Sequence, residues 1–197
     1  MRIFEAYDML SIEGVMRPGD VYMEIGAHKG RFLEASGLLR TDCRYVLFEP
    51  NFLVSQDIVT SLIARGFPVT LTGAAIWSDM AYKDYHADSS EGQGNTLVAG
   101  VHPCICTVQA ITLEQALDRD NIARVRFLAI NAEQAEYEIL KSPAMDRVDY
   151  VTVEFHPGKS GIDTKAFVAE HLPQFETLKF GREGDAYNQW LAKNKAA

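Results

Sequence analysis

The chain has 197 residues, of which 47% are hydrophobic and 23% charged, a balance typical of a soluble globular protein with one domain over residues 1–197. The formal net charge of −8 argues against a broad nucleic-acid-binding surface, which would need clustered lysine and arginine. No basic segment followed by an apolar one opens the chain, and no apolar run is long enough to cross a bilayer, so we expect neither a signal peptide nor a membrane span. The three cysteines are odd in number and form no framework, which favours free thiols in a reducing, cytoplasmic compartment.

Helix-like and strand-like segments alternate along most of the chain. Residues 3–15 carry apolar side chains at a loosely helical period, and we expect a helix there that ends at a Pro-Gly turn. Residues 73–78 are expected to continue the third strand, and the polar, glycine-bearing segment 88–95 is expected to be a loop, either a lid over a substrate or a plain connection. The remaining strands are predicted at 21–25, 44–48, 69–71, 82–87, 104–110, 125–130, 150–155, 175–180 and 186–191, and the remaining helices at 29–39, 52–65, 112–117, 131–141 and 164–171.

The stretch 21–30 reads Val-Tyr-Met-Glu-Ile-Gly-Ala-His-Lys-Gly, an apolar run that passes through two glycines into a predicted helix. Gly26 lets the chain turn sharply off the strand, and Gly30 lets the helix pack closely or lets a ligand approach the backbone. The first N–H groups of such a helix favour a carboxylate or phosphate. The spacing lacks the central glycine of the dinucleotide pattern Gly-x-Gly-x-x-Gly, which disfavours a nucleotide-dependent oxidoreductase. An ordinary strand–turn–helix is the alternative interpretation.

Glu49 stands at the carboxyl end of the second strand, about 20 residues after the glycine turn. A carboxylate at that place can accept hydrogen bonds from both ribose hydroxyls of a bound adenosine. It can equally belong to a helix start, because Pro50 is favoured at a first helical position. Small residues at 73–76 leave room for an adenine, and Trp77 either covers one face of it or belongs to the core.

Six blocks of the chain, in order, resemble the FkbM family of S-adenosylmethionine-dependent methyltransferases. The resemblance implies an α/β, doubly wound class I fold: a mostly parallel seven-stranded sheet with helices on both faces and an antiparallel C-terminal hairpin. It also implies S-adenosylmethionine as cofactor. The blocks are 24–30 (Glu-Ile-Gly-Ala-His-Lys-Gly), 48–51 (Phe-Glu-Pro-Asn), 75–79 (Ala-Ile-Trp-Ser-Asp), 108–117, 128–140 and 153–157 (Val-Glu-Phe-His-Pro).

Carried over position by position, the resemblance implies a set of cofactor-binding residues. The family often has Asp where Glu24 stands and Asn where His28 stands, and the longer Glu24 is expected to shift the contacts to the methionine end. The implied set is Glu24, Gly26, Ala27, His28 and Gly30 in the turn, Glu49, Pro50 and Asn51 at the ribose, and Ala75, Ile76 and Trp77 at the adenine.

The block after the strand 125–130 departs most from the family. Members usually show Lys-Ile-Asp-Val-Glu-Gly-Ala-Glu, whereas residues 129–136 read Ala-Ile-Asn-Ala-Glu-Gln-Ala-Glu. Asn131 carries no charge, so a base or metal role at that position is in doubt. Gln134 replaces the glycine, which predicts that the backbone there does not need a conformation reserved for glycine.

Four polar residues, Asn131, Glu133, Glu154 and His156, follow two neighbouring strands of the predicted sheet and are the catalytic candidates. An alcohol acceptor must lose a proton, and a neutral imidazole with a pKa near 6.5 makes His156 the first choice of base. Its alternative is a surface turn residue. Glu133 is the second choice, and a charge at a helix start is its alternative. Glu133, Glu154 and His156 could together bind a divalent ion as an alternative, but no metal is predicted.

The resemblance implies a methyltransferase, and we expect it to act on a small-molecule hydroxyl of a sugar, polyketide, lipid or peptide metabolite, the acceptors associated with the family. The alternative is a methyltransferase-like domain that binds the cofactor without catalysis, because the block at 129–136 is altered. Nothing in the sequence predicts the oligomeric state.

Overall fold

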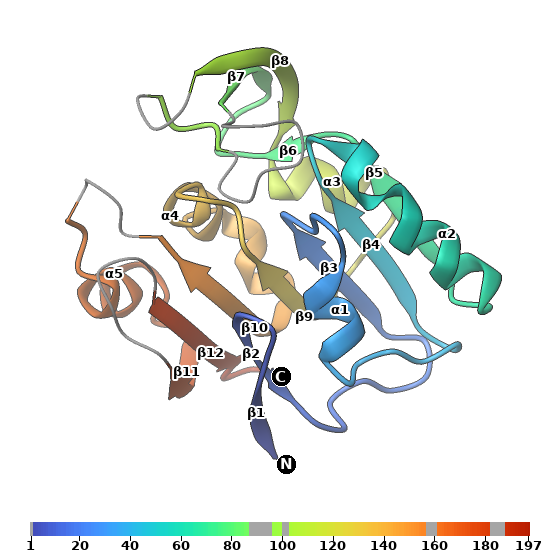
Figure 1. The fold of residues 1–197 in the computed structure, drawn as a ribbon. Helices are drawn as coiled ribbons and strands as arrows, with labels where there is room; N and C mark the ends of the chain where they lie inside the picture. Colours follow the sequence, from blue (N-terminus) through green and yellow to red (C-terminus); the bar gives the residue numbers. More distant parts are fainter. Residues whose placement is uncertain (1, 87–95, 100–102, 157–160, 182–187) are drawn as a thin grey trace.

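The computed structural model describes residues 2–86, 96–99, 103–156, 161–181 and 188–197, and a seven-stranded sheet forms its centre (Figure 1). Five neighbouring strands are parallel, and β12 runs antiparallel to both of its neighbours. The predicted fold class is therefore confirmed. The spatial order is β11 (Phe175–Phe180), β12 (Asn188–Asn194), β10 (Val148–Phe155), β9 (Val125–Ile130), β3 (Val21–Ile25), β4 (Arg44–Phe48) and β5 (Val69–Thr72).

The strand order reverses between β3 and β9. The chain steps outward from β3 to β4 and β5, and then returns to place β9 on the other side of β3. At such a switch point the connections leave in opposite directions and open a crevice beyond the carboxyl ends of the strands. The central strands are apolar and buried on both faces, as expected for a covered parallel sheet.

Helices cover both faces of the sheet (Figure 1). One buried cluster contains side chains of α1 and α2, and the other contains side chains of α3, α4 and α5. Thr112 begins α3 with a capping box: its hydroxyl accepts from the Gln115 N–H and the Gln115 side chain accepts in return. The helices are α1 (Arg31–Ala35), η1 (Phe52–Ser55) continuing into α2 (Gln56–Ala64), α3 (Leu113–Arg119), α4 (Glu136–Leu140), η2 (Pro143–Arg147) and α5 (Thr164–His171).

The helix predicted at 3–15 is wrong. The segment forms a β-hairpin of β1 (Ile3–Ala6) and β2 (Met9–Ile12), with Tyr7 in a left-handed turn conformation at φ 52°. Every residue of β2 is buried, and the strand lies against β10 and β12. Burial on all sides removes the alternation that marks a strand, so the apolar spacing was compatible with a helix.

Three other expectations need correction. The helix at 29–39 shortens to α1 because Gly30 and Gly37 both take positive φ. The helix at 131–141 begins only at Glu136, after a loop. Residues 73–78 do not extend β5: β6 (Ala75–Ile76) instead joins β8 (Cys104–Ile111) and β7 (Ala81–His86) in a separate three-stranded sheet.

The loop predicted at 88–95 and the start of the strand predicted at 186–191 lie outside the described residues. Within the described part of the chain, no helix has the length and apolar character needed to cross a membrane.

Candidate active site

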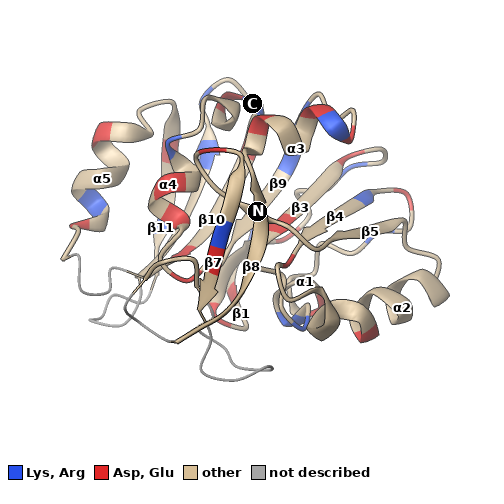
Figure 2. Ribbon diagram, turned by 90° about the horizontal axis from the view of Figure 1, so that it is seen from above, with Lys and Arg blue, Asp and Glu red and all other residues tan. Residues whose placement is uncertain are grey.

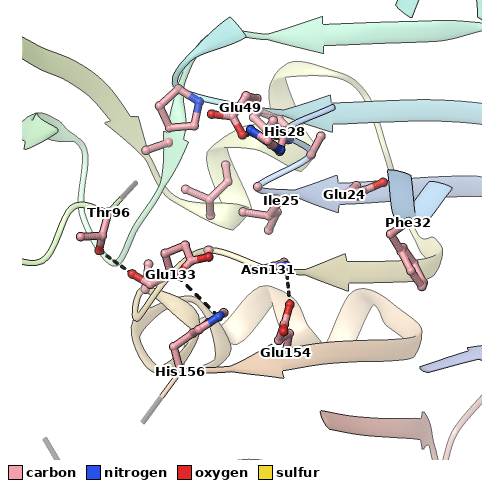
Figure 3. A pocket seen from close by; sticks show the side chains of 18 of the residues that line it. Glu24, Ile25, His28, Phe32, Glu49, Thr96, Asn131, Glu133, Glu154 and His156 are labelled. Atoms are coloured by element: carbon pink, nitrogen blue, oxygen red, sulfur yellow. Dashed lines mark hydrogen bonds and ion pairs between the residues drawn. The ribbon is translucent and has the colours of Figure 1, made fainter. Parts of the chain in front are cut away.

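A cavity of about 290 Å³ opens at the carboxyl ends of β3, β4, β9 and β10 (Figure 3). This volume is near the lower end of the range of small-molecule sites, roughly 300–1,000 Å³. Its walls come from seven parts of the fold. They are the end of β3 with the turn (24–29), Arg31 and Phe32 of α1, residues 48–50, the segment 74–76, Asn131, Ala132, Glu133 and Ala135 with Glu154 and His156, the hairpin tip 7–9, and Tyr85, Thr96 and Leu97 beside the small sheet.

The two glycines of the turn serve backbone packing. A Cβ on Gly26 (φ 78°) would lie 1.8 Å from the Asn131 carbonyl oxygen, so only glycine allows the turn and the β9 loop to meet. A Cβ on Gly30 would lie 2.6 Å from Ile58 of α2. Gly26 and Ala27 line the cavity, whereas Gly30 does not.

Glu49 faces the cavity from the end of β4 and is 6% exposed. Its Oε2 accepts from the His28 N–H at 2.9 Å and its Oε1 from the Asn51 N–H at 2.9 Å. Burial raises the pKa of this carboxyl, and the two backbone hydrogen bonds oppose that shift. A carboxylate has about four acceptor sites, so two remain for a diol. Asn51 itself does not line the cavity.

The cavity wall beside Glu49 is formed by two alanines and an isoleucine and is apolar. Ala74, Ala75 and Ile76 are buried and line the cavity. Trp77 does not line it, and instead packs against the core cluster with the Lys83 ammonium 5.5 Å from its ring centre. A flat, weakly polar ring fits against such a wall beside a carboxylate that can hold a ribose, so these residues fit an adenosyl group.

Glu24 lines the cavity as a buried carboxyl that is 2% exposed. The Tyr22 hydroxyl donates to its Oε2 at 2.6 Å. Burial raises the pKa of Glu24 to about 8, against the opposing effect of the Tyr22 hydrogen bond. At neutral pH this carboxyl is therefore mostly protonated.

Asn131 and Glu154 meet across β9 and β10. The Asn131 amide donates to Oε2 of Glu154, and the Asn131 Oδ1 is buried with no hydrogen-bond partner among the described residues. Glu154 is 5% exposed, and burial raises its pKa to about 8 even though the nearby His156 lowers it. The pair thus combines a buried acceptor oxygen that has no partner among the described residues with a carboxyl that is mostly protonated at neutral pH.

His156 lies between the carboxylates of Glu133 and Glu136, and Figure 3 shows the Glu133 side of this arrangement. Its Nδ1 is 3.0 Å from Oε1 of Glu136 and its Nε2 is 3.5 Å from Oε2 of Glu133. Burial lowers the pKa of His156, but the Glu136 hydrogen bond and the charges of Glu136 and Glu133 outweigh it and raise the pKa to about 9. The ring is an imidazolium at neutral pH, which does not favour the neutral base expected from the sequence.

The turn that carries Glu133 is strained. Glu133 has φ 46° and Gln134 has φ 79°, both in the left-handed region. The prediction that Gln134 relieves the backbone of a glycine-like conformation is therefore wrong. The Thr96 hydroxyl donates to the Glu133 carbonyl and ties this turn to the small sheet.

Several residues of the site were not predicted from the sequence. Glu136 contacts His156 without lining the cavity, and the signal for it was the retention of this glutamate in an otherwise altered block. Tyr7, Asp8 and Met9 were hidden by the wrong helix prediction, and Arg31 gave no signal at all. Among the described residues, no group of three His, Cys, Asp or Glu side chains is arranged to hold a metal ion.

Solved methyltransferase structures share this architecture. A precorrin-6y C5,15-methyltransferase from Geobacter metallireducens GS-15 has a TM-score of 0.53 at 15% identity, covering 91% of this chain and 82% of its own. A putative rRNA-methylase from Clostridium thermocellum has a TM-score of 0.53 at 13% identity, and the match covers 91% of this chain and 88% of the methylase. A fibrillarin/Nop5p complex has a TM-score of 0.56 at 10% identity, and the match covers 91% of this chain and 74% of the chain in the complex. The fold is that of the class I methyltransferases.

The family model described as "Methyltransferase FkbM domain" matches residues 24–192. The chain belongs to the FkbM family of methyltransferases, as the sequence resemblance had indicated, and S-adenosylmethionine is the cofactor that this family and fold define. No curated protein sequence matches it significantly.

Proposed function

We propose that this protein transfers the methyl group of S-adenosylmethionine to a hydroxyl group of a small-molecule acceptor. The observation that carries the proposal is the position of Glu49. Its buried carboxylate faces the cavity with acceptor sites to spare, opposite the polar ends of β9 and β10. One side of the cavity suits an adenosine and the other suits a reacting hydroxyl.

The bound cofactor supplies a methyl group that is already activated for transfer. Alignment is then the main contribution of the chain, and proximity and orientation provide roughly 7–11 kcal/mol for it. Glu49 would accept from the ribose hydroxyls, and Ala75 and Ile76 would border the adenine. The free Oδ1 of Asn131 would accept a hydrogen bond from the cofactor's ammonium or from the acceptor hydroxyl.

We propose that Glu133, rather than His156, is the base that accepts the proton of the acceptor hydroxyl. An imidazolium has no lone pair for a proton, and Glu154 is mostly protonated at neutral pH. Glu133 lines the cavity with its carboxylate beside His156. His156 then acts as a positioning residue that holds the Glu133 carboxylate toward the cavity.

A small acceptor fits the charge of the molecule better than a nucleic acid does. The net charge is −8, and the basic residues are scattered among acidic ones over several elements (Figure 2). The sugars, polyketides, lipids and peptides associated with the family stay open as acceptors. Cys43, Cys104 and Cys106 are free thiols, which supports the reducing, cytoplasmic compartment that we also propose.

Calorimetry on the full chain tests cofactor binding. S-adenosylmethionine and S-adenosylhomocysteine should bind, and Glu49→Ala should weaken both by about 10-fold or more through the loss of charge-assisted hydrogen bonds. Glu34→Gln, which changes an exposed carboxylate of α1, should leave both affinities unchanged. Binding of NAD without binding of S-adenosylmethionine would contradict the proposal.

The second candidate is a domain that binds the cofactor without methyl transfer. The uncharged Asn131 and the protonated His156 favour it, because neither can accept a proton at neutral pH. Turnover to S-adenosylhomocysteine with a pool of hydroxyl compounds separates the two candidates. Methyl transfer that Glu133→Gln abolishes, with cofactor affinity retained, supports the enzyme, and no turnover with any acceptor supports the binding domain.

A further inference from the structure

Arg31, the first residue of α1, lines the cavity at the end nearest the N-terminal hairpin. Its guanidinium donates to the Tyr7 hydroxyl at 2.9 Å and lies 5.4 Å from the centre of the Tyr7 ring. A cation over an aromatic face within about 6 Å is held in place by the ring. The sidechain is thus positioned by a residue that is remote in sequence.

The guanidinium has four further N–H donors and no other partner among the described residues. No carboxylate within the described part of the chain forms an ion pair with it. Arg40, Arg65 and Arg126, by contrast, each form an ion pair with a carboxylate. Arg31 is therefore available to a ligand in the cavity.

The cavity lining is rich in carboxyl groups. It includes Asp8, Glu49 and Glu133 and the mostly protonated Glu24 and Glu154, beside the basic side chains of Lys29 and His156. Carboxylates suit the ribose and the ammonium of an S-adenosylmethionine molecule but repel the carboxylate of its amino-acid tail, which a guanidinium at this end would attract. An α1 of five residues sums few peptide dipoles, so the helix start predicted to attract that carboxylate contributes little.

Tyr7 occupies an unusual place for its role. It sits in the hairpin turn at φ 52°, a conformation that costs a tyrosine roughly 1–2 kcal/mol and that glycine or asparagine would adopt more readily. Strain of this kind is retained where a side chain is needed at that position. In this turn the tyrosine side chain contacts Arg31, 24 residues away, at the rim of the cavity.

We propose that Arg31, positioned by Tyr7, binds the carboxylate of the cofactor's amino-acid tail, and that the N-terminal hairpin thereby forms one end of the cofactor site. The inference rests on the proposed function, because it takes the adenosine to lie at Glu49. From there the tail would lie along the turn 26–29, with its carboxylate near the start of α1. A guanidinium offers the carboxylate two parallel N–H donors there.

Calorimetry with two probes tests the inference on the full chain. S-adenosylhomocysteine carries the amino-acid tail, and 5′-methylthioadenosine has the same adenosine and thioether without it. Arg31→Ala should lower the affinity for S-adenosylhomocysteine by about 10- to 100-fold. It should change the affinity for 5′-methylthioadenosine by less than about twofold. Tyr7→Phe keeps the ring and removes the hydroxyl, and it should lower the affinity for S-adenosylhomocysteine by only about two- to fivefold.

Arg65→Ala is the matched control, because Arg65 also stacks on an aromatic ring, Phe67 at 5.2 Å, but does not line the cavity. It should leave both affinities unchanged. If Arg31→Ala binds both probes like the wild type, or loses affinity for both by the same factor, the inference is overturned while the proposed function stands. If the wild type binds neither probe, both are overturned. Thermal unfolding of each variant confirms that it is folded.

Discussion

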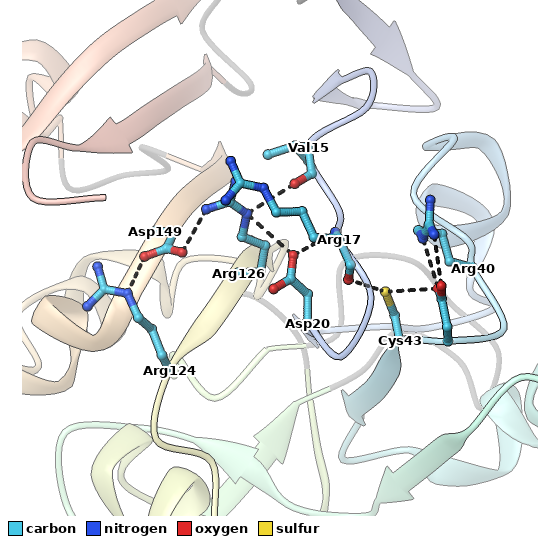
Figure 4. A network of polar contacts seen from close by, with 9 residues as sticks. Val15, Arg17, Asp20, Arg40, Cys43, Arg124, Arg126 and Asp149 are labelled. Carbon is cyan, nitrogen blue, oxygen red and sulfur yellow. Dashed lines mark hydrogen bonds and ion pairs between the residues drawn. The ribbon is translucent and has the colours of Figure 1, made fainter.

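The two ends of the strands in the central sheet differ in how acidic side chains are stabilised. At the amino-terminal edge, Arg126 of β9 lies 3.5 Å from a carboxylate oxygen of Asp20 and 2.9 Å from one of Asp149, and it also donates to the Val15 carbonyl (Figure 4). Arg124 pairs with the other oxygen of Asp149. The buried Asp149 and the partly buried Asp20 thus each have a cation beside them.

At the carboxyl-terminal edge, the carboxyls of Glu24 and Glu154 are buried, and neither is paired with an arginine or lysine among the described residues. Their pKa values rise to about 8 because burial disfavours the charged form. Perturbed carboxyls of this kind gather where chemistry or binding is done. The contrast indicates that one edge is built for stability and the other for a ligand.

The largest effect on stability is expected from removing an ion pair at the amino-terminal edge. Arg126→Ala leaves Asp149 and Asp20 partly buried with less compensation, and we expect a loss of about 3 kcal/mol in the free energy of unfolding, or roughly 6–12 °C in Tm. Urea and thermal unfolding measure it. Arg124→Ala, whose side chain is 44% exposed, should cost less than about 1 kcal/mol. Equal losses in the two variants would contradict the distinction between the buried and the exposed arginine.

A smaller effect sharpens the contrast at the ligand edge. The folded-state pKa of Glu154, about 8, lies above the ordinary value of 4.5, so folding favours the protonated form and the carboxyl costs stability as pH rises from about 5 to 8. Glu154→Gln mimics the protonated form. It should unfold like the wild type at pH 4.5 and be more stable by about 2 kcal/mol at pH 9.

Unfolding curves at both pH values test this expectation. Glu34→Gln changes a carboxylate whose side chain is 48% exposed, and it should show no such dependence on pH. A Glu154→Gln variant that is less stable than the wild type at pH 9 would mean that the carboxyl is ionised and stabilising in the folded protein.

The smallest effect concerns the strained turn beside the cavity. Gln134→Gly places glycine at φ 79°, and we expect a gain of about 1 kcal/mol, or roughly 2–4 °C in Tm. Ala64→Gly in α2 is the control at a helical position, and it should lose about 1 kcal/mol. No gain at Gln134 would show that contacts of the glutamine side chain offset the backbone strain.

Local patterns predicted the parallel core well. The strands 21–25, 44–48 and 125–130 have the predicted bounds, because a strand buried on both faces is a short apolar run between turns. The position of Glu49 at the end of β4 also followed from the sequence. A residue just after a parallel strand must stand at the carboxyl edge of the sheet, whatever the rest of the chain does.

The sequence by itself indicated the strands of the parallel core, the family, and the edge of the sheet at which the cavity opens, because each depends on short motifs and their spacing. Only the tertiary structure decided that residues 3–12 form a hairpin, that Glu136 and Glu133 hold His156 as an imidazolium, and that Tyr7 reaches Arg31. Those features depend on burial and on contacts between residues 20 or more positions apart, and no local period of the chain carries that information.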